Sequence, residues 1–129
     1  TCALPISIDP ELIKKTRIEE MLKAVLEMMS LTKEAFEKED SSIASGVFAK
    51  DAVVDEINHA SASLIADFIE THPGSALSGI FVSGVIRKLE RYGDHCTNIA
   101  EELIFYLDAK VMKHLGKVDQ SLNLTDDNA

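Results

Sequence analysis

Residues 89–107, LERYGDHCTNIAEELIFYL, predict a helix with two distinct faces. At about 100° per residue, its apolar side chains fall in one arc and its acidic side chains in another. The apolar arc holds Ile86, Leu89, Cys96, Ala100, Leu103 and Leu107. The other arc holds Arg87, Glu90, Asp94, Asn98 and Glu101. Core packing does not require this second arc, which is either a solvated polar face or a site for a hard cation.

A second acidic stretch, KDAVVDEINHAS at residues 50–61, favours the cation. Asp51 and Asp55 are four residues apart, so on a helix one carboxylate lies a turn above the other. Asn58 and His59 follow near the same face. Helix bundles hold metals with facing carboxylates, so two such pairs on neighbouring helices can converge on one ion or a small cluster.

The composition indicates a single soluble helical domain. The chain has 129 residues, 5% aromatic side chains and no tryptophan, which favours helices packed through aliphatic seams. The net charge of −9 argues against binding nucleic acid or anionic lipid through bulk electrostatics. The two cysteines, Cys2 and Cys96, imply no disulfide framework, and there is no signal peptide, so we expect a cytoplasmic location.

Turn signals divide the chain into three expected helices. Asp9-Pro10 predicts a helix start, Asp40-Ser41-Ser42 a turn with a new N-cap, and residues 72–75, HPGS, the clearest break. The helices are expected at about residues 9–40, 42–71 and 75–115, with Gly116 as a C-cap. The expected domains are a lead-in at 1–8, a three-helix domain at 9–116 and a disordered tail at 117–129.

These lengths predict an all-α fold, an antiparallel up-down-up three-helix bundle with long helices. Asp55 lies 18 residues before Pro73, and Glu90 lies 17 residues after it. With a rise of about 1.5 Å per residue, the second and third helices place both sites at nearly the same height. The same matching puts Asp51 near Asp94, so the two acidic pairs are expected to form one site.

The two acidic motifs resemble those of the PhoU family of phosphate-uptake regulators. The matching residues are Asp51-x-x-x-Asp55 and Glu90-x-x-x-Asp94, the latter within Leu-Glu-Arg-x-Gly-Asp. Asn98 and Glu101 fall where the family has its N-x-x-E continuation. The likeness covers roughly residues 15–115. The loop HPGSALSGIF lacks the Asp-Leu-Arg signature that stand-alone regulators carry after the proline.

The resemblance implies a regulatory domain of phosphate transport rather than an enzyme. Such domains bind multinuclear metal clusters, often iron or zinc, at these motifs, and they act on a phosphate transporter. A related arrangement fuses the domain to the cytoplasmic C-terminus of sodium/phosphate cotransporters. The lead-in SIDPELIKKT resembles that junction, so the expected partner is a transporter in the same chain or a separate one. The alternatives are a stand-alone regulator and a purely structural helical assembly module.

The expected metal ligands are the four carboxylates and two secondary groups. They are Asp51, Asp55, Glu90, Asp94, Asn98 and Glu101. Iron, zinc, manganese and magnesium are the candidate ions, and the oxygen ligands favour hard ones. No catalytic residue is expected, because no nucleophile–base pair or facing Glu-x-x-His pair stands out. Wide apolar arcs on the first and third helices predict a homodimer that leaves the acidic face open.

Overall fold

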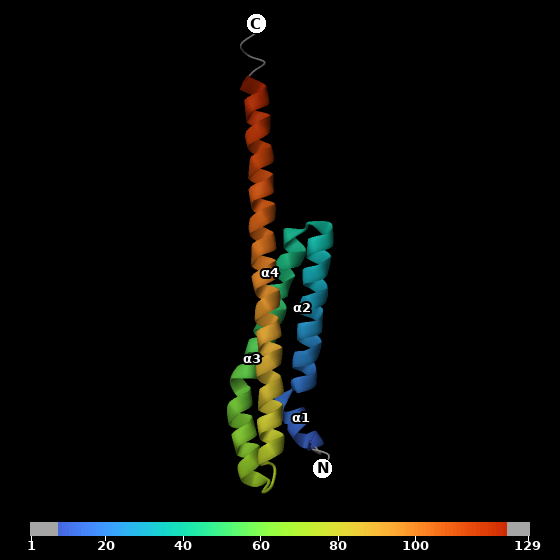
Figure 1. Ribbon diagram of the computed structural model, residues 1–129, viewed down its shortest axis with the longest axis vertical. Helices are drawn as coiled ribbons and strands as arrows, with labels where there is room; N and C mark the ends of the chain where they lie inside the picture. The colour runs from blue at the N-terminus through green and yellow to red at the C-terminus, as the bar shows by residue number, and fades with distance from the viewer. Residues whose placement is uncertain (1–7, 124–129) are drawn as a thin grey trace, which may run out of the picture.

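The protein forms four helices of unequal length (Figure 1). The computed structural model describes the backbone of residues 8–123 and the side chains of residues 8–118. The helices are α1 (Pro10–Thr16), α2 (Ile18–Lys38), α3 (Ser41–Thr71) and α4 (Ala76–Asn123). The all-helical class predicted from the sequence is therefore confirmed, with four helices within the described range rather than three.

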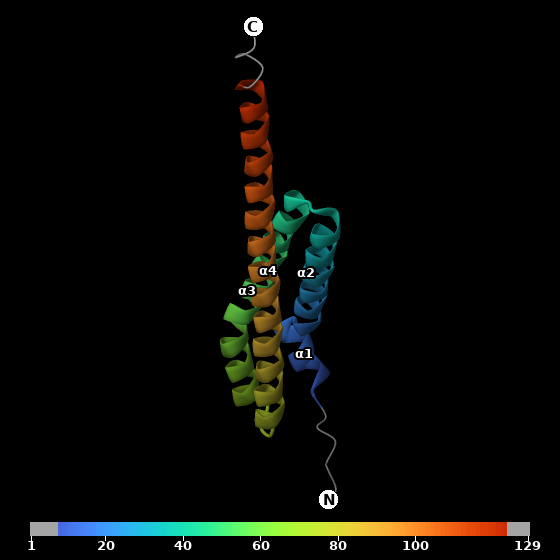
Figure 2. The same cartoon turned by 45° about the horizontal axis from the view of Figure 1, so that its top comes forward.

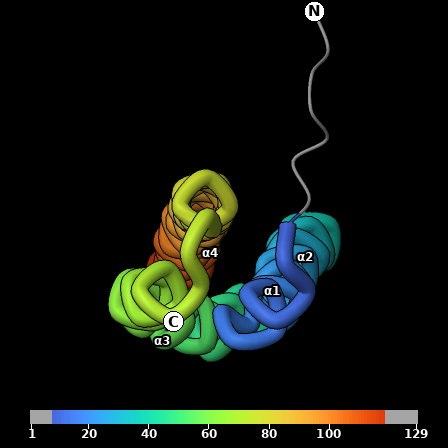
Figure 3. The backbone as a smooth tube through the Cα atoms, turned by 90° about the horizontal axis from the view of Figure 1, so that it is seen from below, coloured from blue at the N-terminus to red at the C-terminus, as the bar shows by residue number. Residues whose placement is uncertain are grey.

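The three long helices lie side by side with α3 between the other two. Figure 1 shows α2 rising from the blue end, α3 returning and α4 rising again. The tilted view in Figure 2 keeps the same neighbours, and the end-on view in Figure 3 shows α2 and α4 on either side of α3. No helix within residues 8–123 is both long and apolar enough to cross a bilayer.

The predicted turns are where the sequence placed them. Asp9 caps α1 by accepting a 2.9 Å hydrogen bond from Glu11 N, with Pro10 at the first helical position. Asp40 caps α3 by accepting hydrogen bonds from Ser42 N and Ile43 N at 2.8 and 3.4 Å. Between α3 and α4, Gly74 has a φ of +88°, a backbone conformation that glycine adopts without a Cβ penalty.

The first expected helix is broken at Arg17, which has a φ of 57°. In an unbroken helix Leu12 and Met21 would lie about 180° apart, so both could not face the same neighbours. The break lets both side chains become fully buried, at 0% exposure each. Arg17 also donates hydrogen bonds to Glu20 and, at 2.7 Å, to Glu56 of α3, which hold the left-handed residue in place. The prediction of one continuous helix from residue 9 to 40 was wrong for this reason.

The buried stripe of α2 lies about one residue from the stripe that the sequence suggested. The helical spacing of the sequence predicts a main seam of Ile18, Leu22, Val25, Met29 and Phe36, with Met21, Met28 and Ala35 beside it. Val25 is buried as expected, but its buried neighbours on the helix are Met21, Ala24, Met28, Thr32 and Ala35. Leu22, Met29 and Phe36 are 46, 50 and 69% exposed. The apolar arc of α2 is wider than the surface that α3 and α4 can cover, so one edge of it faces solvent.

The apolar arc of α4 is buried as predicted. Ile86, Leu89, Cys96, Ala100, Leu103 and Leu107 all belong to the core. They meet a seam on α3 that includes Val47, Val54, Ile57 and Phe68. Cys96 is a buried free thiol, as its place in the apolar arc indicated. Burial raises its pKa, which keeps the thiol protonated and inert.

Helix α4 continues well beyond its predicted end. It passes through Gly116 and reaches Asn123, so Gly116 is not a C-cap and residues 117–123 are not a disordered tail. Figure 1 shows this part of α4 projecting past the α2–α3 turn. A single glycine in a helix interior destabilises the helix by only about 1 kcal/mol relative to alanine, and the helix propensity of the residues around it can offset this. The predicted lead-in falls largely on residues 1–7 and the rest of the tail on 124–129, outside the described residues.

Two glycines of α4 give opposite predictions for substitution by alanine. A Cβ on Gly79 would lie 2.6 Å from Ile69 Cδ1 and 3.0 Å from Ile65 Cγ2, whereas Gly84 has nothing within 4 Å. Gly84→Ala should stabilise the fold by about 1 kcal/mol through helix propensity. Gly79→Ala should destabilise it, since overpacking costs about 1–3 kcal/mol. Chemical denaturation of both variants measures these changes, and a stabilised Gly79→Ala would contradict the close contact of α3 with α4.

Candidate metal centre

The two acidic motifs lie at the same level of the bundle, where α3 and α4 come close together. Gly93 of α4 is buried, and a Cβ built on it would lie 3.5 Å from both Asp51 Oδ1 and Val54 Cγ1 of α3. The absence of a side chain at residue 93 therefore lets the first acidic residue of α3 lie directly beside α4. This register agrees with the height match expected from the two helix lengths.

Asp51 is the most enclosed of the acidic residues. Its Oδ1 atom is buried and has no hydrogen-bond partner among the described residues. Burial raises the pKa of Asp51, and the nearby negative charges of Asp55 and Asp94 raise it further. A buried carboxylate oxygen without a donor is costly, because the water that it has lost is replaced by nothing. The position therefore favours either a proton or a cation.

Glu90 is perturbed in the same direction. A hydrogen bond with the Asp94 carboxyl is the main cause that raises the pKa of Glu90. Partial burial and the charges of Asp94 and Asp55 add to the effect, and the charge of Arg91 opposes it. Like charges held close together disfavour the ionised form of both carboxyl groups, and a proton or a cation between them would relieve this. Asp51, Asp55, Glu90 and Asp94, the four-carboxylate cluster, thus form one electrostatic unit across α3 and α4.

The two residues expected as secondary ligands lie further along α4. Asn98 and Glu101 are exposed, one and nearly two turns beyond Asp94. The charges that perturb Asp51 and Glu90 come from Asp55 and Asp94, and Glu101 is not among them. His59, which we did not expect as a ligand, has its Nδ1 atom 2.8 Å from the Asp55 backbone oxygen. The mutual effects on pKa therefore link the four carboxylates to one another, but they do not link Asn98 or Glu101 to this group.

The four-carboxylate cluster has the oxygen donors that a hard cation prefers, but its side chains are not arranged around a common point. Across residues 8–118, no group of three or more His, Cys, Asp or Glu side chains is arranged to hold a metal ion. The donors are nevertheless all oxygen atoms, and the unpartnered Asp51 Oδ1 lacks a positive counterpart. An ion would require side-chain rotations that bring the carboxylates together.

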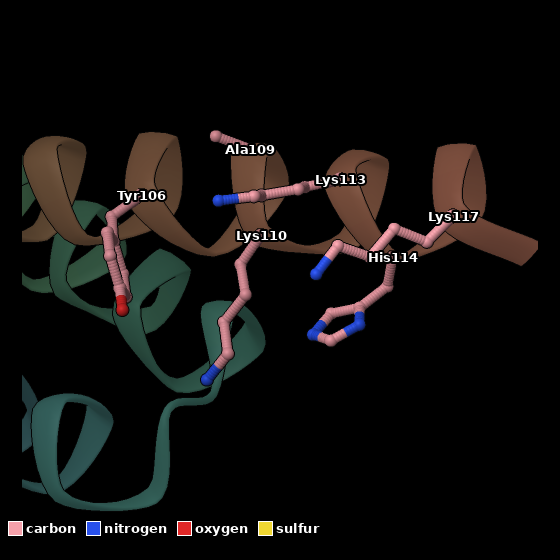
Figure 4. Close-up of a pocket in the computed structure, with 6 residues that line it drawn as sticks. All are labelled: Tyr106, Ala109, Lys110, Lys113, His114 and Lys117. Carbon is pink, nitrogen blue, oxygen red and sulfur yellow. The ribbon is translucent and has the colours of Figure 1, made fainter.

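A basic surface on α4 was missed by the sequence analysis. Figure 4 shows its side chains on the helix, with Lys110 reaching toward the α2–α3 turn. The residues are Tyr106, Ala109, Lys110, Lys113, His114 and Lys117. The Lys110 amino group lies 2.6 Å from Glu39 Oε2 at that turn. Spacings of three and four residues could have revealed this stripe, but the helix was expected to end before residue 117.

Replacing Asp51 with asparagine should stabilise the metal-free protein. The raised pKa of Asp51 means that its charge destabilises the fold above that pKa. The penalty disappears as the pH falls through the raised pKa toward the ordinary value of 3.8, because both states are then protonated. Asp51→Asn should therefore gain on the order of 1 kcal/mol at neutral pH, and the gain should shrink in acid. Thermal melts with chelator present measure this, and a loss of stability at pH 7 would contradict the crowding of the carboxylates.

Two curated proteins resemble this chain over most of its length. The first is the phosphate-specific transport system accessory protein PhoU homolog 1 of Thermotoga maritima, with 29% identity over 103 residues. The second is the phosphate-specific transport system accessory protein PhoU homolog of a Burkholderia species, with 22% identity over 107 residues. The matches cover 80 and 83% of this chain but only 44 and 46% of the relatives. The chain thus spans less than half the length of these relatives.

No solved structure gives a significant match to the chain. The family model described as the PhoU domain matches residues 18–103. That segment starts at the first residue of α2, immediately after the break at Arg17, and includes both acidic motifs on α3 and α4. The match covers well over half of the sequence, so this chain belongs to the PhoU domain family.

Proposed function

We propose that this chain is a PhoU-like regulator of phosphate uptake that works with a phosphate transport system. The observation that carries this proposal is the PhoU domain match over residues 18–103. The two curated relatives, both named as accessory proteins of phosphate-specific transport systems, support it. The role is regulatory rather than enzymatic, and it would be exercised at the cytoplasmic face of the membrane.

The four-carboxylate cluster would hold the metal through which this domain acts. Asp51 would supply its unpartnered Oδ1, and Asp55, Glu90 and Asp94 would supply the other oxygen ligands. Asn98 and Glu101 would complete the coordination of a second ion or of bound water. Burial raises the pKa of Asp51, the hydrogen bond with Asp94 raises that of Glu90, and neighbouring negative charges add to both shifts. A bound cation would offset these effects by attracting the charged carboxylates. It would also give an otherwise acidic surface an affinity for phosphate.

Removal of two carboxylates should abolish metal binding. Asp55→Ala/Asp94→Ala takes one ligand from each helix, so the remaining pair cannot chelate an ion from both sides. Elemental analysis after loading with Mn²⁺ or Fe³⁺ should give stoichiometric metal in the wild type and none in the double variant. The matched control is Asp67→Ala/Glu70→Ala, which removes the same charge from the far end of α3 and should keep the metal. Equal metal content in both double variants would place the site elsewhere.

Metal loading should raise the melting temperature of the wild type. A ligand that binds the folded state at 100 times its dissociation constant stabilises it by about 2.7 kcal/mol. Chelator should lower the melting temperature, and added Mn²⁺ or Fe³⁺ should restore it. The double variant Asp55→Ala/Asp94→Ala should show neither change. A wild type that responds to neither treatment would support a solvated acidic face and a structural role for the domain.

The regulatory role can be tested by phosphate uptake in cells that lack the gene for this chain. We propose that the chain restrains the transporter, so loss of the chain should raise uptake when phosphate is plentiful. The wild-type chain should restore low uptake, Asp55→Ala/Asp94→Ala should not, and Asp67→Ala/Glu70→Ala should do so. Unchanged uptake on deletion would contradict the proposed function.

Fusion to a sodium/phosphate cotransporter is the second candidate. It rests on the likeness of the lead-in SIDPELIKKT to the junction of such fusions. Repeated apolar spans in the reading frame upstream of Thr1 would establish the fusion. The transporter would then be a partner in the same polypeptide rather than a separate protein.

We also propose that two copies pair. The wide apolar arcs of α2 and α4 remain partly uncovered in one chain, and a second copy would cover them with one self-complementary patch. Such pairing would leave the four-carboxylate cluster accessible, because that cluster lies where α4 meets α3 and not where it meets α2.

A further inference from the structure

A groove runs along one side of the molecule where α2 meets α4, and it is called here the α2–α4 groove. Met29 and Phe36 of α2 and Ile99 of α4 line its centre, and Tyr106 of α4 continues it. Phe36 and Ile99 each border two adjoining hollows, so the centre of the groove is continuous. All four side chains are at least 50% exposed. The groove is therefore an apolar surface that one chain leaves open to solvent.

The α4 side of the groove has the spacing of a helix-packing seam. Its residues are alternately four and three positions apart, and they are Lys88, Tyr92, His95, Ile99, Glu102 and Tyr106. This period of about 3.5 residues is the pattern by which helices pack in pairs. The core uses a different stripe of α4, which includes Leu89, Ala100 and Leu107. The groove can therefore receive a helix that does not belong to this bundle.

Basic side chains gather at both ends of the groove. At the end nearer the start of α4, three of them surround Tyr92, namely Lys88, Arg91 and His95. At the other end, four follow Tyr106 on α4, and Figure 4 shows them along the projecting helix: Lys110, Lys113, His114 and Lys117. Lys88 and Lys113 lie about 37 Å apart along α4, which is the length of a helix of about 25 residues.

Most of these positive charges have no counterpart within the chain. Among residues 8–118, Lys110 is paired with Glu39, whereas four other cations of the groove form no ion pair: Lys88, Arg91, Lys113 and Lys117. Of the acidic side chains that line the groove, Glu102 is the one without an ion pair in this part of the chain. A chain of net charge −9 thus keeps unpaired positive charge at both ends of one apolar groove.

We propose that the α2–α4 groove is a docking site for an amphipathic helix of a partner protein, with apolar residues at its centre and acidic residues at both ends. The apolar centre of the partner would pack on Phe36 and Ile99, where each helix covers the exposed side chains of the other. Its carboxylates would meet Lys88 at one end and Lys113 at the other. Charge complementarity of this kind selects the partner and fixes its position along the groove.

A second copy of this chain does not suit the groove. Its own groove is basic at both ends, so like charges would face each other in either orientation. Two copies that pair would use other exposed apolar side chains, such as Leu77 and Ile80 at the start of α4. A bilayer surface is flat and does not enter a groove, and the net charge of −9 opposes its approach to anionic lipid.

The docking site goes beyond the proposed function and does not depend on the metal. The four-carboxylate cluster lies where α4 meets α3, and the groove lies where α4 meets α2. Loss of docking should therefore leave metal binding unchanged. Metal content measured on the same samples distinguishes a failure of this proposal from a failure of the proposed function.

Two synthetic helical peptides of about 25 residues test the docking site. Both carry leucine at helical spacing in their central turns, and one has glutamate and the other lysine in the first and last two turns. Titration calorimetry should show that the wild type binds the glutamate peptide at least about ten-fold more tightly, because several exposed ion pairs add modest contributions. Added salt should reduce this difference. Equal binding of the two peptides, or binding of neither, would overturn the proposal.

Charge reversal tests the two basic ends. Lys88→Glu/Lys113→Glu changes one cation at each end and should reverse the preference, so that the lysine peptide binds more tightly. Lys14→Glu/Lys23→Glu is the control, because it makes the same change in net charge on α1 and α2, outside the groove. The control should keep the preference of the wild type. The same reversal in both variants would show that net charge and not the groove decides, and would contradict the docking site.

A neutral substitution tests the apolar centre. Ile99→Gln should weaken the glutamate peptide at least about ten-fold, because it removes a side chain that the peptide would bury. Phe105→Gln should bind as the wild type does, since Phe105 is 73% exposed and lies about 120° away from Ile99 around α4. Circular dichroism should show the same helix content in every variant. Vesicles of phosphatidylcholine and phosphatidylglycerol should not sediment the wild type, and sedimentation without binding of the glutamate peptide would assign the surface to a membrane instead.

Discussion

The close contact between α3 and α4 is the constraint on which the rest of the structure depends. Gly79 and Gly93 permit it at two levels, the first against Ile65 and Ile69 and the second against Asp51 and Val54. These two contacts fix how α4 is rotated about its axis and how far it is shifted along α3. The acidic motifs of the two helices therefore lie at the same level of the bundle. The four-carboxylate cluster is thus a consequence of backbone proximity.

The same contact between α3 and α4 destabilises the metal-free protein, because it holds acidic side chains close together. Asp51 Oδ1 is buried without a partner, and the pKa values of Asp51 and Glu90 are both raised. A structure selected for stability alone would place apolar or paired groups there, as it does at Val54 and Leu89. Unfavourable groups that persist inside an otherwise well-packed bundle are typical of binding sites, where a ligand supplies the missing interaction. The PhoU domain match covers this region.

Helix α4 presents three chemically different sides to its surroundings. Its core side packs against α2 and α3, its α3 side carries Glu90 and Asp94, and its α2 side carries Ile99 and Tyr106. One helix can therefore carry an apolar core stripe, an acidic stripe and a second apolar stripe, because about 100° separates successive residues. The projecting end beyond Lys110 adds a basic surface to an acidic chain.

The sequence by itself determined the helical class, the caps at Asp9 and Asp40, the turn before α4 and the pairing in height of the two acidic motifs. These features follow from local backbone chemistry and from counting residues along regular helices, so no tertiary information was needed. Only the tertiary structure decided the break at Arg17, the buried stripe of α2 and the length of α4. The first two depend on which surface a neighbouring helix covers: Leu12 and Met21 could both be buried only after a break, and an apolar arc wider than its neighbours must leave one edge exposed. The length of α4 could not be read from the sequence because Gly116, a residue type that often ends a helix, lies in the interior of this one.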